Sequence, residues 1–176
     1  MAQGATDVIF DNCEGYNNDD PGNSHWNSSN FLVYTESDPG GNIYIQNCLS
    51  QDTISGFKIK HAGPKKLIVH NCVSIDDNIP YGGASDYSSF RYSLAYNGGL
   101  VHLGITDPNP YMDGGMLVEH MTIVSGGACL NTQDSYLEGG SVIQNNIFYN
   151  SSSARVMQFW QWTEDMSPFN VTSDKN

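Results

Sequence analysis

Six short segments of this chain share one pattern, and this repeat limits the possible folds more than any other feature. Each segment alternates apolar and polar residues, ends in a polar residue that is usually Asn, and is followed by a similar short tail. Self-similarity of this kind is the signature of repeat architectures. The segments are residues 8–13, 43–48, 67–72, 89–93, 116–121 and 141–146.

The spacing of the copies indicates a solenoid built from strands. Equivalent residues, from Cys13 to Asn146, recur every 21 to 35 residues, and no helical pattern lies between the copies. The alternation inside each copy has period 2, as in a β-strand. We therefore predict an all-β parallel β-helix of about six coils, over roughly residues 7–156. Neighbouring coils should lie about 4.8 Å apart.

The matching of residue types at equivalent positions favours the solenoid over other all-β folds. Leucine-rich repeats have a similar period, but their Leu-x-x-Leu-x-Leu pattern is missing. An antiparallel sandwich suits a chain of this length, yet it would not explain the matches. In a solenoid, equivalent Asn side chains form ladders and equivalent apolar residues form the core. The matched residues are Asn12, Asn47, Asn71 and Asn145, and beside them Cys13, Cys48 and Cys72.

One local motif resembles a known superfamily. The Asn-Cys-x-Ser turn at 47–50 and 71–74, followed by the strand at 55–59, is similar to the coil consensus of right-handed parallel β-helices. These form the pectate-lyase-like superfamily, and the resemblance extends over residues 8–150. It implies a right-handed helix. It does not decide function, because the superfamily includes lyases, hydrolases, epimerases, phage tailspikes and adhesins.

Length and charge narrow the classes of partner. The 176 residues indicate a single domain, 1–176, with an aromatic C-terminal tail at 157–176. The net charge of −12 argues against nucleic acid and suits an extracellular setting, calcium binding or simple solubility. The sequence contains no apolar run of about 18 residues, so we predict no membrane-spanning helix. The start lacks the features of a signal peptide.

The start also lacks an amphipathic helix that could cover an open end of the solenoid. We expect either a piece of a longer solenoid or end-to-end self-association.

The cysteines give no sign of a disulfide framework. Cys13, Cys48 and Cys72 should stack with parallel Cα–Cβ vectors, which is poor geometry for a bridge, so we predict reduced, buried thiols.

Acidic residues follow the repeat in two adjacent coils. Asp52 and Asp76 occupy equivalent positions and should lie about 5 Å apart, with Asp77 beside them. Such carboxylates could bind Ca²⁺. The alternative is an ordinary turn, in which Asn and Asp bond to their own backbone.

A cluster of basic residues suggests an anionic ligand. Four of the seven Lys and Arg residues are Lys58, Lys60, Lys65 and Lys66, and Arg91 follows one coil later. Such a patch could dock an acidic polysaccharide. The order of Lys58, Lys60, Asn71-Cys72 and Asp76-Asp77 resembles calcium-dependent pectate lyases with a lysine base. That resemblance implies Lys60 as the base of a β-elimination, with Asp76 and Asp77 as calcium ligands. From the basic patch and the repeat we add Arg91 as a catalytic residue, Lys58 as a substrate-binding residue and Asp52 as a further calcium ligand.

Aromatic residues are numerous for so polar a chain. Trp26, Tyr81 and Tyr87 lie in or beside long excursions from the repeat, and we predict that they contact sugar rings. Tyr16, Tyr96 and Tyr149 share one coil position, which suggests a structural stack instead.

Two classes of function remain open on the sequence. The first is a carbohydrate-active β-helix that binds or cleaves an acidic polysaccharide with calcium. The second is a non-catalytic module, either a structural or sugar-binding part of a surface or virion fibre, or a fragment of a larger protein. The lysine cluster and the Asp52/Asp76 pair motivate the first class, and the short length and the lack of a decisive catalytic set motivate the second, which is the alternative.

Overall fold

The protein is all-β in the computed structural model. The structure describes residues 7–18, 28–34, 42–60, 66–82, 88–98, 101–103, 117–125, 129–132, 142–150, 157–159 and 172–174. Within these ranges there are 19 strands and no helix, and the strands form three sheets. Every strand pairing is parallel. No helix in this part of the chain has the length and hydropathy to cross a membrane.

Each sheet takes every third strand of the chain. Sheet 1 contains β1 (Val8–Asp11), β4 (Asn42–Gln46), β7 (Lys66–His70), β10 (Ser89–Arg91), β13 (Leu117–Glu119), β16 (Val142–Gln144) and β19 (Thr172–Asp174). Sheet 2 contains β2 (Glu14–Tyr16), β5 (Leu49–Gln51), β8 (Val73–Ile75), β11 (Leu94–Gly98), β14 (Thr122–Ser125) and β17 (Ile147–Asn150). Sheet 3 contains β3 (Ser29–Tyr34), β6 (Ser55–Lys60), β9 (Ile79–Gly82), β12 (Val101–Leu103), β15 (Leu130–Thr132) and β18 (Met157–Phe159).

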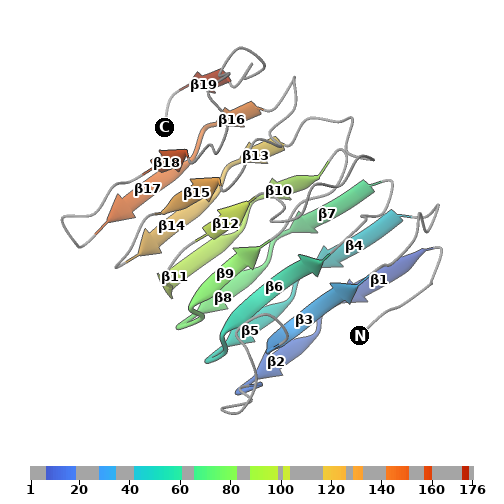
Figure 1. The fold of residues 1–176 in the computed structure, drawn as a ribbon. Helices are drawn as coiled ribbons and strands as arrows, with labels where there is room; N and C mark the ends of the chain where they lie inside the picture. The colour runs from blue at the N-terminus through green and yellow to red at the C-terminus, as the bar shows by residue number, and fades with distance from the viewer. Residues whose placement is uncertain are drawn as a thin grey trace.

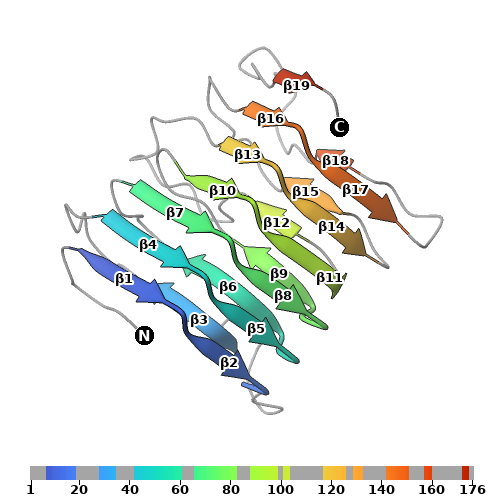
Figure 2. The same ribbon diagram turned by 180° about the vertical axis from the view of Figure 1, so that it is seen from behind.

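The chain visits the three sheets in a fixed order. We call each set of three consecutive strands, one from each sheet, a coil. Six coils follow one another from the blue N-terminal end to the red C-terminal end (Figure 1). Seen from behind, sheets 1 and 2 run side by side along this direction (Figure 2). The arrangement is compatible with the predicted parallel β-helix. Strands β18 and β19 continue it into the stretch predicted as an aromatic tail.

The predicted register of the repeat is confirmed. The amide of Leu49 donates to the carbonyl of Cys13 and the amide of Val73 to that of Cys48, each at 2.9 Å. The same link continues to the last coil, where Ile147 donates to Met121 at 2.8 Å. The residues aligned from the sequence therefore lie one above another.

Sheets 1 and 2 are joined by a corner that needs left-handed backbone. One residue in each coil there has φ between 49° and 55°, a region in which Asn is favoured among residues with a side chain. We call this the first corner. Asn71 donates to Asn47 at 2.8 Å, so the predicted amide ladder forms between coils 2 and 3, whereas Asn47 donates to the carboxylate of Asp11, next to Asn12, at 2.8 Å. The six residues are Asn12, Asn47, Asn71, Tyr92, His120 and Asn145.

The interior is filled by columns of stacked side chains. Phe31, Phe57 and Tyr81 are in register in sheet 3, with ring centroids 4.9 and 5.3 Å apart. Cys48 and Cys72 form part of a second column and are buried. A long side chain in such a column contacts its equivalents in both neighbouring coils, so packing and register support each other.

The buried thiols should be inert in the native state. All four cysteines are free, and burial raises the pKa of Cys48, of Cys129 and of Cys72, the last to about 12. Thiolate is the reactive form, so a disulfide reagent at pH 8 should modify these three only after unfolding. Ellman's assay with and without denaturant measures this. Rapid native reaction of Cys72 would contradict it.

Candidate functional site

The outer face of sheet 2 is unusually apolar and aromatic for a surface. Side chains of a strand alternate between its two faces, so each strand contributes an inward residue between two outward ones. The inner row is buried or partly buried, as at Ser50, Ser74, Ala95 and Ile123. The outer row beside the first corner is Glu14, Leu49, Val73, Leu94, Thr122 and Ile147. The other outer row is Tyr16, Gln51, Ile75, Tyr96, Val124 and Tyr149.

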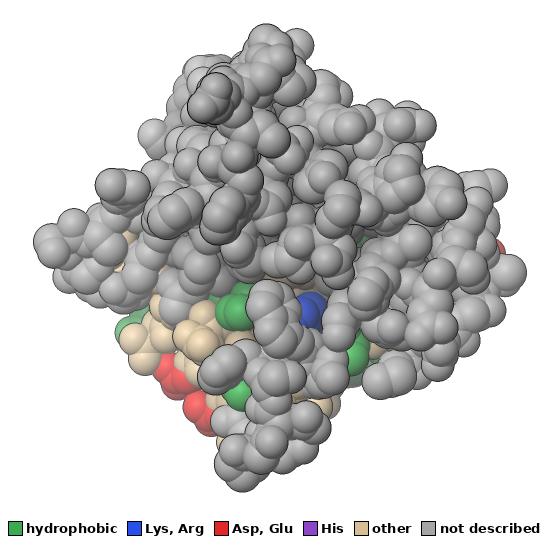
Figure 3. Space-filling view, viewed as in Figure 1, with side chains coloured by type: hydrophobic (Ala, Val, Ile, Leu, Met, Phe, Trp, Pro, Cys, Tyr) green, Lys and Arg blue, Asp and Glu red, His purple; other side chains and the backbone are tan. Residues whose placement is uncertain are grey.

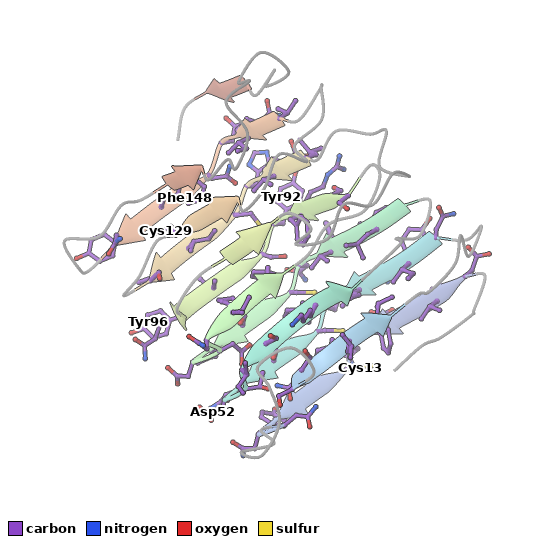
Figure 4. The ribbon with its side chains drawn as sticks, in the orientation of Figure 1. Cys13, Asp52, Tyr92, Tyr96, Cys129 and Phe148 are labelled. Carbon is purple, nitrogen blue, oxygen red and sulfur yellow. The ribbon has the colours of Figure 1, made fainter. Side chains whose placement is uncertain are left out.

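Three tyrosines stand out on this face. Tyr16, Tyr96 and Tyr149 are 47%, 54% and 60% exposed, and Figure 4 shows Tyr96 pointing away from the sheets. The Tyr16 hydroxyl donates to Glu14 at 2.6 Å, which raises the pKa of Tyr16. The interpretation of these tyrosines as a structural stack is wrong: they belong to coils 1, 4 and 6, so their rings are separated by other residues of the row.

Tyr81 was predicted to contact sugar, and the structure contradicts this. It is fully buried in the aromatic column of sheet 3. Its hydroxyl lies 3.0 Å from the carbonyl of Cys72 and 2.9 Å from that of Leu94. The ring follows the period-2 alternation of β9 into the core, and backbone carbonyls satisfy its one polar atom. Tyr81 is therefore a core residue.

Asp77 was predicted as a calcium ligand at the surface, but it is completely buried. It accepts hydrogen bonds from the Ser74 hydroxyl at 2.5 Å and from the Thr53 amide at 3.1 Å. A Cβ at Gly56 would collide with Oδ2 of Asp77, so the carboxyl fills the space that this glycine leaves. Asp77 connects coils 2 and 3 from the inside and does not face a ligand.

Asp52 and Asp76 lie at equivalent corner positions of adjacent coils, as predicted. The Asp52 amide donates to the carbonyl of Ile75 at 3.1 Å. Both residues have left-handed backbone, with φ of 54° and 56°, as do Asn17 and Asn97 in the coils on either side. This second corner, between sheets 2 and 3, therefore gives both acids a turn role of the kind that Asn and Asp serve. Acidic side chains gather at this edge (Figure 3), where Asp52 lies (Figure 4).

A metal site is not evident in the described part of the chain. No group there contains three or more His, Cys, Asp or Glu side chains placed to hold an ion. Asp52 contacts Gln51, and Asp76 accepts a hydrogen bond from Asn97. Calcium binding by Asp52 and Asp76 stays a prediction, and it would need oxygen ligands beyond these two side chains.

The predicted basic site is not assembled by the residues that the structure describes. Lys58 was predicted to bind substrate, yet it is only 6% exposed. Arg91 forms an ion pair with Glu119 at 3.1 Å, on the outer face of sheet 1. Lys60 ends β6, but its side chain, like those of Lys65 and Lys66, lies outside the described residues. Trp26 and Tyr87 lie outside them as well.

The chain matches no family model, curated protein or solved structure. The candidate site therefore depends on geometry alone. A signal for this site exists in the sequence. The middle residue is small or apolar, as an inward position requires, in each of the three-residue strands that end in these tyrosines: Glu14-Gly-Tyr16, Leu94-Ala-Tyr96 and Ile147-Phe-Tyr149. Aligned by period 2, this pattern places the tyrosines on the outside.

Burial of Asp77 should give the fold a measurable pH dependence. Burial, opposed by hydrogen bonds from Ser74, Ser50 and Thr53, raises its pKa above the unfolded value of about 3.9. The folded state then binds the proton more tightly, so Asp77 lowers the free energy of unfolding as pH rises from about 3.9 through its folded pKa. Above that pKa its contribution is constant.

Asp77→Asn should remove this part of the pH dependence, because the amide cannot ionise. Asp77→Ala should cost about 1–3 kcal/mol at pH 4, because Thr53 and Ser74 lose a buried acceptor. The cost should fall as pH rises, because only the wild type loses stability when Asp77 ionises. Urea denaturation of both variants from pH 4 to pH 8 measures these effects. An Asp77→Asn curve that keeps the wild-type slope would contradict the assignment.

Proposed function

We propose that this protein is a right-handed parallel β-helix of the pectate-lyase-like type that binds a polysaccharide on the outer face of sheet 2, without cleaving it. The observation that carries the proposal is the row of exposed tyrosines on that face. The apolar outward residues between these rings, among them Ile75, Val124 and Ile147, make the face a continuous apolar surface of the kind that marks interaction sites.

Tyrosine chemistry suits a sugar. The ring packs on the apolar face of a pyranose, and the phenol oxygen bonds to its hydroxyl groups. The row is also periodic along the direction in which the coils follow one another. Tyr96 and Tyr149 lie two coils apart, about 10 Å, and Tyr16 lies three coils before Tyr96, about 14 Å. A linear polymer of repeating units can contact all three at once, and several weak contacts add to useful affinity.

The charge on the face favours an uncharged polymer. Glu14 is the one acidic residue in the two outer rows, which contain no Lys or Arg. Asp52 and Asp76 border the face at the second corner. Negative groups at the edge repel an anionic chain. The acidic polysaccharide predicted from the lysines is therefore the second candidate ligand, with calcium as the cation that it would require.

Cleavage by β-elimination is the second candidate activity, and one observation favours it. Asp52 and Asp76 lie on adjacent coils at the same corner, as a shared cation would require. Polygalacturonate with calcium should then gain ultraviolet absorbance from new double bonds, and Lys60→Ala should abolish the gain. We expect no gain in absorbance with the wild-type protein, because Asp77, which the resemblance gives as a calcium ligand, is buried in the interior.

A role in a surface fibre is compatible with binding. Among the described strands, β1, β2 and β3 each pair on one side only, so coil 1 presents three strand edges at one end. Unpaired edges are templates for adding further strands. End-to-end association with another copy or a longer chain, in an extracellular setting, is part of the proposal.

Loss of the tyrosines should weaken sugar binding without weakening the fold. Tyr96→Ala with Tyr149→Ala removes two rings that are more than half exposed, so the melting temperature should change little. Binding should weaken at least about tenfold, because stacked rings supply most of the contact. Affinity electrophoresis in gels containing hydroxyethylcellulose, galactomannan or polygalacturonate measures it.

The matched control is Tyr44→Ala, which removes a partly exposed tyrosine from the outer face of sheet 1. Its migration in each gel should equal that of the wild type. If the wild-type protein is retarded by none of the three polymers, or if the double variant is retarded as strongly as the wild type, the proposed function is wrong.

A further inference from the structure

The first corner lacks its usual Asn in two adjacent coils. Four of its six left-handed residues are Asn, but coils 4 and 5 have Tyr92 and His120, with φ of 49° and 53°. Bulky residues are uncommon in this region because Cβ approaches the following carbonyl. Single residues held in such conformations concentrate at functional sites. Tyr92 is therefore the outlier in residue type, since His is enriched in this region together with Asn and Asp, and His120 differs from the Asn that four other coils have at this corner.

Ring contacts and backbone conformation roughly offset each other at this pair. The rings of Tyr92 and His120 lie parallel, with centroids 4.7 Å apart and planes 4° apart, and His70 contacts Tyr92 from the other side of the pair. Each such contact contributes about 0.5–1.5 kcal/mol, against about 1–2 kcal/mol for the left-handed backbone of a bulky residue such as Tyr92, so the pair has no clear advantage in stability over Asn. The amide ladder of Asn47 and Asn71 in the preceding coils shows what this corner forms otherwise.

The position of the pair relates it to the tyrosine face. Tyr92 and Tyr96 both belong to coil 4, on opposite sides of the outward residue Leu94 (Figure 4). Tyr96 follows Tyr92 by four positions, which is about 13 Å in extended chain. In coil 5, His120 has the same relation to Thr122. The outer row Leu94, Thr122 and Ile147 is thus bordered by Tyr92 and His120 on one side and by Tyr96 and Tyr149 on the other.

The two rings of the pair cover one face of each other. His70 also contacts Tyr92 from the neighbouring coil 3, in a T-shaped arrangement with centroids 5.4 Å apart. Tyr92 is nevertheless 53% exposed, and His120 is exposed as well. The polar groups that this pair can offer to a ligand are the phenol oxygen and the imidazole nitrogens, and such groups bond to hydroxyls.

We propose that Tyr92 and His120 are specificity residues of the carbohydrate site. The bound chain runs along the coils over Leu94, Thr122 and Ile147, stacks on Tyr96 and Tyr149, and has its hydroxyl groups read by Tyr92 and His120. This rests on the proposed function and adds to it a direction, a span from coil 4 to coil 6, and a means of distinguishing sugars by hydroxyl configuration.

Two variants separate recognition from structure. Tyr92→Phe keeps the ring, the stacking and the backbone strain, and removes only the phenol oxygen. The double change Tyr92→Asn with His120→Asn gives the corner the residue that its other four positions have. We expect the double variant to unfold at the same denaturant concentration as the wild type or at a higher one, because Asn relieves the strain.

The measurement is affinity electrophoresis with hydroxyethylcellulose and galactomannan, which differ in hydroxyl configuration. Both variants should lose at least about threefold in the ratio of the two dissociation constants, while retaining binding through Tyr96 and Tyr149. Asn47→Ser is the matched control. It removes an amide from the same corner in coil 2, and it should lower stability and leave the ratio unchanged.

The outcomes distinguish the inference from the proposed function. If both variants keep the wild-type ratio, the inference is wrong, while the loss of binding on changing Tyr96 and Tyr149 still supports the sugar site. If the double variant unfolds at a lower denaturant concentration and keeps the ratio, the pair is structural and the inference is wrong. If the wild-type protein binds neither polymer, the inference fails together with the proposed function.

Discussion

Parallel hydrogen bonding between equivalent strands of successive coils determines everything else in this protein. Because the strands are in register, each residue lies on its equivalent, and a side chain acts as part of a column. Phe57 stacks between Phe31 and Tyr81 for this reason. In a column, a residue type that packs well in one coil also contacts equivalent residues in the two neighbouring coils, so a favourable contact is repeated along the column.

The two corners are the second constraint, because the chain turns there through left-handed residues, in six coils at the first corner and in coils 1 to 4 at the second. This requirement explains most of the Asn in the repeat and also Asp52 and Asp76, whose backbone matches that of Asn17 and Asn97. An acid at such a position therefore has a conformational reason to be there. That reason lowers the weight of a carboxylate pair as a sign of metal binding.

The fold could be predicted from the repeat, and so could the register, the thiol column and the amide ladder, because all follow from period and residue type. The direction of individual side chains near the ends of strands was harder. Asp77 and Lys58 are charged and Tyr81 has a polar tip, so polarity placed them outside, whereas all three are buried. Hydrogen bonds of Asp77 and Tyr81 make that burial possible, and one partner of each, Thr53 and Leu94, comes from another coil, which one strand's sequence does not reveal.

The three tyrosines show the opposite error, because they were predicted to form a structural stack and are exposed instead. Their equivalent positions in different coils were taken as a sign of stacking, but residues on the inner and on the outer faces of the sheets both occupy equivalent positions. The period within each strand separates the two, since a residue two places from an outward side chain is itself outward. Applied to coil 4, this rule puts Leu94 and Tyr96 on one face, with Tyr92 at its border. The other four coils have Asn at the first corner. Against this consistent pattern, the replacement of Asn by Tyr92 and His120 in coils 4 and 5 indicates a role beyond the turn itself.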